Sequence, residues 1–301
     1  METVKRACPL CQSVEASGIL AGANFNEKDF DEFSFASRKF PEYSHYSLYL
    51  CRKCDLIYAN PIPSLDALVK RYSKADFDSQ QESYFASQTY KRFLPGIMKK
   101  LPDTTGVIDI GTGDGAFLRS LIDMGFTKVI GIEPSVDSIK SAGNGVRHLI
   151  KQGVFNPNDF DNSQFSLITC FQTLEHLYDP LQMCRDIYDK LKNGGAGFFV
   201  CHNHRSLFSR TLGLKSPIID LEHLQLFSPK SLSLLLKCSG FVDIEIKYFI
   251  NRYPLYYWIK LFPLPDKFKL FCITVLKKIK IGNLPVSILA GNIAAVGYRK
   301  R

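Results

Sequence analysis

The chain has 301 residues, of which 46 % are hydrophobic and 22 % charged, as in an ordinary folded globular protein. This composition excludes a mostly disordered chain, and 20 Gly and 15 Pro without a short period exclude a collagen-like or low-complexity sequence. Lysine and arginine exceed aspartate and glutamate by 38 to 29, a net charge of +9, and no apolar run reaches the roughly 18 residues that cross a bilayer.

Two cysteine pairs stand out in the first sixty residues. Cys8 and Cys11 form one C-x-x-C unit, and Cys51 and Cys54 form a second. Residues 1–11 lack the apolar segment of a secretory signal, so we expect a cytoplasmic protein whose cysteines are thiols or metal ligands rather than disulfides. Four thiolates favour a structural zinc site, because they leave no coordination position for water. The alternative is four thiols without metal.

Three regions that differ in composition and in hydrophobic pattern follow one another along the chain. Residues 1–60, which hold the cysteine pairs, predict a zinc-binding ribbon. Residues 61–100 have a polar helical pattern and predict a helical connector. From residue 101 to about residue 251, short apolar runs alternate with helical stretches, which is typical of a parallel sheet covered by helices. We therefore expect an α/β domain over residues 101–301.

The apolar runs and the helix signals place the elements of this domain. The predicted strands cover residues 107–110, 128–132, 146–150, 165–171, 197–201, 241–248 and 288–298. The predicted helices cover residues 116–124, 179–191 and 228–239. Ser228 is expected as the N-cap of the last helix, with Pro229 at its first position. The second helix is expected to end at the Asn-Gly-Gly run of residues 193–195. Five further cysteines are expected in the core, at Cys170, Cys184, Cys201, Cys238 and Cys272.

The strongest motif joins the first predicted strand to the first predicted helix. Glycine occupies every second position, at Gly111, Gly113 and Gly115, where it lets the backbone turn tightly and approach a ligand. Asp109 precedes the loop by two residues. Glu133 ends the next strand, where a parallel sheet brings it to the same edge, and its carboxylate can accept hydrogen bonds from ribose hydroxyls. The spacing differs from the G-x-G-x-x-G of nicotinamide dinucleotide folds, and Asp109 suits a cationic ligand that lacks phosphate.

This loop, Glu133 and the LEHLYDP stretch of residues 174–180 resemble the motifs of class I S-adenosylmethionine-dependent methyltransferases. The resemblance covers about residues 101–251 and implies a Rossmann-like core with a seven-stranded sheet and S-adenosylmethionine as cofactor. It implies that Asp109 helps to hold the amino group of the cofactor through water and that Glu133 holds the ribose. The cofactor-binding residues that it implies are Asp109, Gly111, Thr112, Gly113, Gly115, Glu133, Pro134 and Gln172.

Residues 51–61 add a second resemblance. They look like part of the N-terminal zinc-binding module of bacterial methyltransferases of glycan and deoxysugar biosynthesis. In relatives that C-methylate nucleotide-linked sugars, a Tyr-x-Glu-His motif supplies the base. Here Glu222 and His223 stand at the matching positions, and Asp220 replaces the tyrosine. The resemblance implies a small-molecule or glycan-type acceptor, including a lipid-linked one.

Methyl transfer is an in-line displacement, in which orientation supplies much of the rate and a general base helps when the acceptor is a hydroxyl or a carbon acid. Histidine suits the role of base because its pKa lies near neutrality. We predict His223 as the base, oriented by Glu222, with His176 or Gln172 near the acceptor. As alternatives, Glu175 and His176 pin the helix that follows them, and His223 only packs beneath the next loop. The histidines that we expect at the surface are His202 and His204.

The excess positive charge is confined to the end of the chain. Residues 241–301 hold 11 basic and 3 acidic residues, a net of +8, whereas the first 240 residues hold 27 and 26, a net of +1. Within this part, residues 252–282 form an aromatic, apolar and lysine-rich insert, and residues 266–281 predict a helix that begins at Asp266 and ends before Gly282. Such a helix is too short to span a bilayer but can lie in its interface. The insert fits a peripheral contact with the inner membrane face, a lid over the pocket, or a solvated basic face.

The sequence thus predicts a cytoplasmic methyltransferase with a zinc ribbon, and two other functions stay open. An RNA methyltransferase with an N-terminal zinc finger would use basic residues to contact phosphates. Nucleic acid is the less favoured partner, because the positive charge lies in the insert rather than around the cysteines and no Asn-Pro-Pro-Tyr type motif follows the fourth strand. A non-catalytic scaffold would not need the intact Asp109, the three loop glycines and Glu133.

Overall fold

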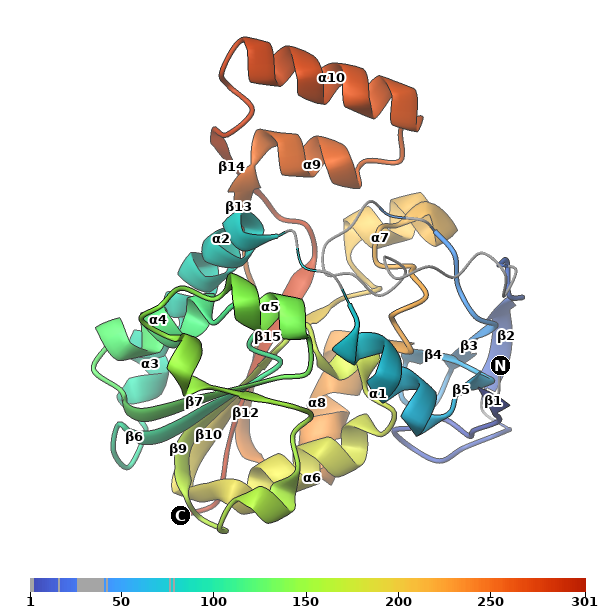
Figure 1. Cartoon of the computed structure of the whole chain (residues 1–301). Helices are drawn as coiled ribbons and strands as arrows, with labels where there is room; N and C mark the ends of the chain where they lie inside the picture. Colours follow the sequence, from blue (N-terminus) through green and yellow to red (C-terminus); the bar gives the residue numbers. More distant parts are fainter. Residues whose placement is uncertain (1–2, 16, 26–40, 42, 76, 78) are drawn as a thin grey trace.

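The computed structural model describes residues 3–15, 17–25, 41, 43–75, 77 and 79–301. A seven-stranded sheet forms its centre (Figure 1). Its strands are, in spatial order, β12 (Val242–Tyr248), β15 (Asn292–Tyr298), β10 (Leu191–His202), β9 (Phe165–Phe171), β6 (Thr105–Ile110), β7 (Thr127–Glu133) and β8 (Ile150–Gln152). β15 runs antiparallel to β10 and β12, and the other neighbouring pairs are parallel. The predicted Rossmann-like α/β class is confirmed.

Helices cover both faces of this sheet, because side chains alternate between the faces along each strand. Val107 and Leu167 pack in one apolar layer with α2, α3 and α4, whereas Ile108 and Ile168 pack in the other with α6 and α8. The helices are α1 (Leu65–Ser73), α2 (Gln80–Lys91), α3 (Leu94–Met98), α4 (Ala116–Asp123), α5 (Val136–Ser141), α6 (Pro180–Lys190), α7 (Leu207–Leu212), α8 (Pro229–Cys238), α9 (Leu255–Leu261) and α10 (Asp266–Lys278). As predicted, Ser228 caps α8 and Pro229 occupies its first position.

The N-terminal module is joined to the α/β domain by a shared sheet. A four-stranded sheet has the spatial order β11 (Gln225–Leu226), β4 (Leu56–Ala59), β3 (Leu48–Cys51) and β2 (Ser17–Ala21), and a separate pair is formed by β1 (Thr3–Val4) and β5 (Ile62–Pro63). β11 comes from the α/β domain and pairs antiparallel with β4. The cysteines of the module pack in the same apolar layer as α6 and α8. The module and the domain therefore share both a sheet and a core.

The prediction of a strand over residues 146–150 is wrong for most of these residues. Arg147–Leu149 form a 3₁₀ turn (η3), and β8 begins only at Ile150. The guanidinium group of Arg147 donates to the backbone oxygens of Ala142 and Lys140, which holds the chain in a compact turn. Further 3₁₀ turns are η4 (Pro157–Asp159), η5 (Leu174–His176) and η6 (Gly213–Lys215).

Two predicted boundaries near the middle strands are also wrong. Residues 193–195 do not end a helix, because β10 begins directly after α6 and has an irregular register between Leu191 and Ala196. A Cβ on Gly195 would lie 3.0 Å from the backbone oxygen of Phe165, so only glycine fits this irregular part of the strand. The predicted strand 288–298 is two strands: β14 (Pro285–Ile288) pairs with β13 (Asn251–Pro254), and β15 starts after a turn at Gly291, whose φ is +102°.

The basic insert forms a helical hairpin of α9 and α10. Figure 1 shows α10 as the outermost helix, lying along α9 on the side away from the sheet. The predicted helix is confirmed with a shorter extent, from Asp266 to Lys278, and Pro265 rather than Asp266 occupies the N-cap position. Among the described residues, no helix is both long enough and apolar enough to cross a membrane.

Candidate cofactor and acceptor site

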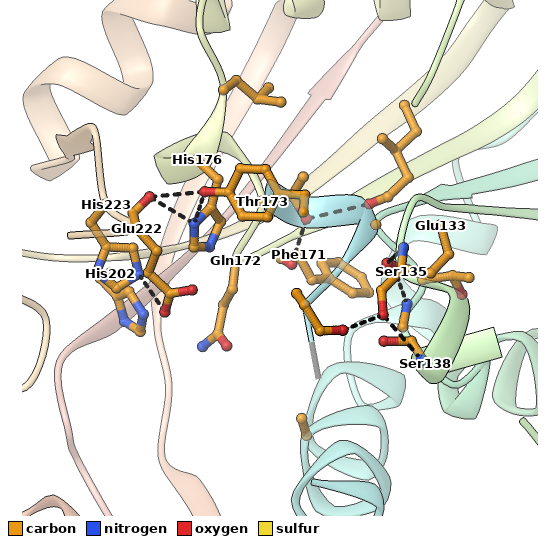
Figure 2. A pocket seen from close by; sticks show the side chains of 18 of the residues that line it. Glu133, Ser135, Ser138, Phe171, Gln172, Thr173, His176, His202, Glu222 and His223 are labelled. Carbon is orange, nitrogen blue, oxygen red and sulfur yellow. Dashed lines mark hydrogen bonds and ion pairs between the residues drawn. The ribbon is translucent and has the colours of Figure 1, made fainter. Parts of the chain in front are cut away.

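A cavity of about 850 Å³ lies at the edge of the sheet where the parallel strands end. Its floor is made by the ends of three strands and the residues that follow them, namely 109–114 at β6, 132–135 at β7 and 171–173 at β9. Its other walls include α1, α9 and the loop before β11. Ligands of open α/β sheets bind at this edge. Apart from Gly115, the predicted cofactor residues and the predicted catalytic residues line this cavity at different places (Figure 2).

The glycine loop folds as the sequence predicts. Gly111 and Gly113 have φ values of +73° and +59°, which favour glycine, and a Cβ on Gly111 would lie 2.3 Å from Oγ1 of Thr173. Gly115 has φ +72° and is the N-cap of α4. It does not line the cavity, and a Cβ there would lie 3.1 Å from the side chain of Val146. Gly115 thus serves the packing of the loop, whereas Gly111 and Gly113 face the cavity.

Asp109 lies beneath this loop and fixes its conformation. Its carboxylate oxygens accept hydrogen bonds from Oγ1 of Thr112 at 2.7 Å and Oγ1 of Thr169 at 2.5 Å. Burial raises the pKa of Asp109 to about 6, although these two hydroxyl donors oppose the rise. Since Thr112 also lines the cavity, Asp109 holds one wall of the cofactor end in place.

Glu133 ends β7 directly beside the loop. One carboxylate oxygen accepts from the backbone N–H of Gly113 and the other from that of Ser135, each at 2.8 Å. Burial raises the pKa of Glu133 to about 7, against the effect of these two amides. Each oxygen has a second lone pair, so the carboxylate can also accept from two vicinal hydroxyls. This donor set fits a ribose, and the following residue, Pro134, lines the cavity.

Three polar side chains meet at the other end of the cavity (Figure 2). Nδ1 of His176 lies 2.9 Å from the backbone oxygen of Glu222, and Nδ1 of His223 lies 2.9 Å from that of Ile218. A carbonyl oxygen only accepts, so we assign the ring proton of each neutral histidine to Nδ1, which makes Nε2 the basic atom. Nε2 of His223 lies 3.9 Å from a carboxylate oxygen of Glu222. The structure therefore brings His176, Glu222 and His223 together at this end of the cavity.

The expectation that His202 and His204 lie at the surface is wrong. His202 lines the cavity, with its ring centroid 5.1 Å from that of His223 and its Nδ1 3.0 Å from Oδ1 of Asn292. His204 is buried, with Nε2 2.9 Å from the backbone oxygen of Asp55, and burial lowers its pKa. His202 is the last residue of β10 and His204 follows it, where the chain passes first along the cavity and then towards the second cysteine pair.

Gln172 directly follows β9 and has a strained backbone conformation. Its φ is +50°, a left-handed value that is uncommon for a residue with a side chain. The backbone N–H donates to the oxygen of Val200 at 2.7 Å, and the side chain points into the cavity (Figure 2). Such strain is typical of functional sites. Gln172 therefore stands between the cofactor end and the histidine end of the cavity.

The LEHLYDP stretch positions these side chains through its acidic residues. Asp179 caps α6 by accepting from the backbone N–H of Gln182 at 2.9 Å. Glu175 is completely buried and accepts from the backbone N–H of His202 at 2.6 Å, and burial raises its pKa to about 7. Glu175 thus ties the turn that carries His176 to the end of β10, rather than pinning α6.

Arg6 connects the N-terminal module to the same turn and was not identified from the sequence. Its guanidinium group donates to the backbone oxygens of Ala59, Tyr178 and Leu224 and to Oε1 of Gln225. Burial lowers its pKa to about 10. No local motif marks Arg6, because its partners lie between 53 and 219 residues away in the chain.

The four cysteines of the two C-x-x-C units meet in space. Their sulfur atoms all lie within 4.8 Å of one another, with 3.5 Å between Cys8 and Cys54 and 3.4 Å between Cys11 and Cys51. A tetrahedral zinc site with thiolate ligands has sulfur–sulfur distances of about 3.8 Å, so the donor set and its size fit zinc. Of the other cysteines, three are buried as expected, but Cys238 is exposed and Cys272 is only partly buried.

Comparison with known proteins agrees with this geometry. A family model described as a methyltransferase domain matches residues 77–246. Curated relatives include EEF1A lysine methyltransferase 2 of Mus musculus, 32 % identical over 96 residues, which are 31 % of this chain and 38 % of that protein. The tRNA U34 carboxymethyltransferase of Campylobacter hominis is 28 % identical over 128 residues, 40 % of this chain and 42 % of that protein. The ubiquinone biosynthesis O-methyltransferase of Idiomarina loihiensis is 29 % identical over 133 residues, 41 % of this chain and 51 % of that protein.

These matches cover less than two thirds of each relative's own length. Among solved structures, the YcgJ protein of Bacillus subtilis is similar with a TM-score of 0.50 and 16 % identity, over 70 % of this chain and 98 % of that protein. At this identity the likeness concerns the fold alone.

Proposed function

Because the chain belongs to the methyltransferase-domain family and is an S-adenosylmethionine-dependent methyltransferase, we propose that it methylates a small-molecule or glycan-type acceptor, with His223 as general base. One observation carries this proposal. A single cavity contains Glu133 at the end that suits a ribose and the His176–Glu222–His223 group at the other end. The acceptor can therefore lie between the cofactor and the base.

The cofactor, when bound, supplies an electrophilic methyl group on a positively charged sulfur. In our proposal Glu133 accepts hydrogen bonds from the two ribose hydroxyls of the cofactor. Asp109 holds the amino group of the cofactor through a water molecule and also keeps Thr112 in place. Gly111 and Gly113 let the backbone approach the ligand closely. The residues that we propose to contact or shape the cofactor site are Asp109, Gly111, Thr112, Gly113, Gly115, Glu133, Pro134 and Gln172.

At the other end of the cavity, His223 removes the proton of the acceptor. The hydrogen bond of its Nδ1 to the oxygen of Ile218 fixes the ring, and Nε2 receives the proton as the acceptor atom takes the methyl carbon from sulfur. Glu222 stabilises the protonated ring from 3.9 Å. His176, held between Tyr72 and the backbone of Glu222, positions the acceptor together with Gln172.

The enclosed position of the base favours a small acceptor group. His223 is 7 % exposed, so a large folded partner could reach it only through a narrow extended group. The resemblance of residues 51–61 to the zinc module of glycan-modifying methyltransferases supports a glycan-type acceptor, including a lipid-linked one. We also propose that Cys8, Cys11, Cys51 and Cys54 bind one structural zinc ion, and that the protein acts at the inner face of the membrane through its basic insert.

Label transfer tests this function. The purified protein is incubated with methyl-labelled S-adenosylmethionine and an extract of cells that lack it, and the products are separated into RNA, organic-soluble and water-soluble fractions. We expect label in the organic-soluble or water-soluble small molecules. Label that nuclease releases from RNA would refute the proposed acceptor class in favour of an RNA methyltransferase.

Replacing Glu133 by glutamine is expected to weaken the binding of S-adenosylhomocysteine by about 10- to 100-fold. The reason is the loss of charge-assisted hydrogen bonds, each of which contributes about 1.5–3 kcal/mol. Titration calorimetry measures the change. Asp161→Asn, an exposed carboxylate before β9, is the matched control and should bind as the wild type does. Unchanged affinity in Glu133→Gln would contradict the ribose assignment.

Cofactor affinity should also fall as the pH decreases through 7. Burial raises the pKa of Glu133 to about 7, so a large part of the carboxyl groups is protonated below that pH. Ribose hydroxyls donate hydrogen bonds to the ionised form of Glu133, so a protonated Glu133 must release its proton when the cofactor binds. Cofactor binding is therefore weaker by up to about tenfold at pH 6 than at pH 8. Calorimetry in two buffers of different ionisation enthalpy measures the released proton. If the affinity does not depend on pH, or if Glu133→Gln shows the same pH dependence as the wild type, Glu133 is excluded as the group that releases the proton.

A further inference from the structure

The hairpin of α9 and α10 has two sides with different surroundings. On its inner side, Tyr257, Trp258 and Leu261 of α9 line the cavity, together with Phe262. Nε1 of Trp258 donates to the backbone oxygen of Val286 at 3.0 Å, which fixes α9 on β14. On the outer side, α10 packs along α9 and forms the edge of the molecule (Figure 1). One wall of the cavity is therefore carried by a hairpin whose other side faces outward.

The outer side of α10 carries an apolar stripe. Phe268, Phe271, Val275 and Ile279 are exposed by 51, 63, 38 and 55 %. Their spacing of three, four and four residues places them on one face of the helix. Four large apolar side chains exposed together on one short helix are more than the scattered exposure that globular surfaces tolerate. The stripe therefore indicates a binding surface rather than a solvated face.

The charges around the stripe identify the kind of partner. The insert of residues 252–282 holds seven basic residues and one acidic residue, a net of +6. Lys267, Lys277, Lys278 and Lys280 are exposed on or directly after α10. Apolar side chains that enter the acyl boundary, next to lysines that meet anionic headgroups, are the pattern of an interfacial amphipathic helix. Each lysine near an anionic leaflet strengthens the attraction to the bilayer surface.

The cavity next to this hairpin is lined mainly by apolar side chains. Beyond the glycine loop and the histidine group, its wall is formed by Phe208, Ile218, Trp258, Leu261, Phe262 and Ile288. A polar sugar or a nucleotide alone would leave these side chains without a matching surface. An apolar chain would cover them, and its burial is the main source of affinity in such a pocket.

We propose that α10 docks on an anionic bilayer surface through the Phe268–Ile279 stripe, and that the acceptor is a membrane amphiphile whose apolar chain lies against α9. The part of this inference that concerns the acceptor rests on the proposed methyl transfer, whereas the part that concerns the docking surface is independent of it. The hairpin is then both the membrane contact and one wall of the acceptor site. An amphiphile can pass from the leaflet to His223 along α9 without exposing its chain to water.

Vesicle flotation tests the docking surface without any activity measurement. The full chain is mixed with vesicles of phosphatidylcholine, with or without phosphatidylserine. We expect binding to the anionic vesicles, and Phe268→Ser/Phe271→Ser should lower it by at least about tenfold, because each buried phenyl ring contributes about that factor or more. Lys267→Gln/Lys278→Gln should reduce the preference for phosphatidylserine. The matched control Ile19→Ser/Leu20→Ser changes two exposed apolar residues of β2 and should float as the wild type does.

Two further readouts separate the possible failures. Unchanged binding of S-adenosylhomocysteine shows that the variants are folded, and label transfer to an extract, partitioned between phases, reports the acceptor. Organic-soluble label that falls in the phenylalanine variant supports the proposal. Absence of flotation, or retention on RNA instead of vesicles, would overturn the docking surface. Water-soluble label alone would overturn the amphiphilic acceptor while leaving methyl transfer intact, whereas absence of label from every fraction would contradict the proposed function itself.

Discussion

Replacing His223 by asparagine is expected to lower kcat for methyl transfer by about 10²- to 10⁴-fold, the usual contribution of a general base. Asparagine retains a side-chain N–H that can reach the oxygen of Ile218, but it has no counterpart of Nε2. The loop should therefore keep its conformation while the acceptor keeps its proton. Binding of S-adenosylhomocysteine should be unchanged, because His223 lies at the other end of the cavity from Glu133.

The measurement is single-turnover label transfer to the fraction that the wild type labels. His148→Asn, an exposed histidine of η3, is the matched control and should retain full activity. A kcat in His223→Asn within about twofold of the wild type would contradict the role of His223. If His223→Asn loses both activity and binding of S-adenosylhomocysteine, His223 has a structural role. In that case Glu222→Gln, which leaves His223 in place, should also lose binding of S-adenosylhomocysteine.

Replacing Cys54 by serine is expected to remove the metal and unfold the N-terminal module. Structural zinc binds zinc-finger peptides with about 10–16 kcal/mol, which is comparable to the whole free energy of unfolding of a domain, about 5–15 kcal/mol. Cys54 is completely buried, and the oxygen of the next residue, Asp55, accepts from His204 and Ser228 of the α/β domain. Loss of zinc should therefore also lower kcat, since β11 begins two residues after His223 and pairs with the module.

Elemental analysis and thermal unfolding measure this effect. We expect one zinc ion per chain in the wild type, almost none in Cys54→Ser, and a strongly lowered unfolding temperature in the variant. Cys238→Ser is the matched control, because Cys238 is exposed and lies outside the cysteine group. A wild-type protein without zinc whose unfolding temperature does not change with a chelator would refute the metal site.

Local sequence signals predicted the parts of the fold that depend on local geometry. The glycine loop follows from φ values that only glycine adopts easily, and α8 follows from Ser228 and Pro229. The errors occur where distant segments decide the structure. Residues 193–195 have the sequence of a helix end, but they belong to β10 because β10 pairs with the neighbouring β9 on either side of them. The apolar run of residues 288–298 divides because β13, more than thirty residues earlier, pairs with its first part.

The same distinction applies to the candidate site. Asp109 and Glu133 could be placed because parallel strands bring their ends to one edge, and His176 and His223 because motif resemblance marked them. Tyr72 of α1, which contacts His176, and the α9 wall could not be placed, since no pattern relates them to the sheet edge. The four cysteines that we propose as zinc ligands were recognisable from their spacing alone. The contact between β11 and the N-terminal module, in contrast, depends on two short strands whose paired residues are 167 and 169 positions apart.

A crystal structure of the protein with S-adenosylhomocysteine tests the proposed site most directly. We expect the ribose hydroxyls within hydrogen-bond distance of Glu133 and the sulfur facing the His176–Glu222–His223 group across the cavity beside Gln172. A sulfur that points away from this group, or a ribose that does not contact Glu133, would contradict the proposed methyl transfer to an acceptor beside His223.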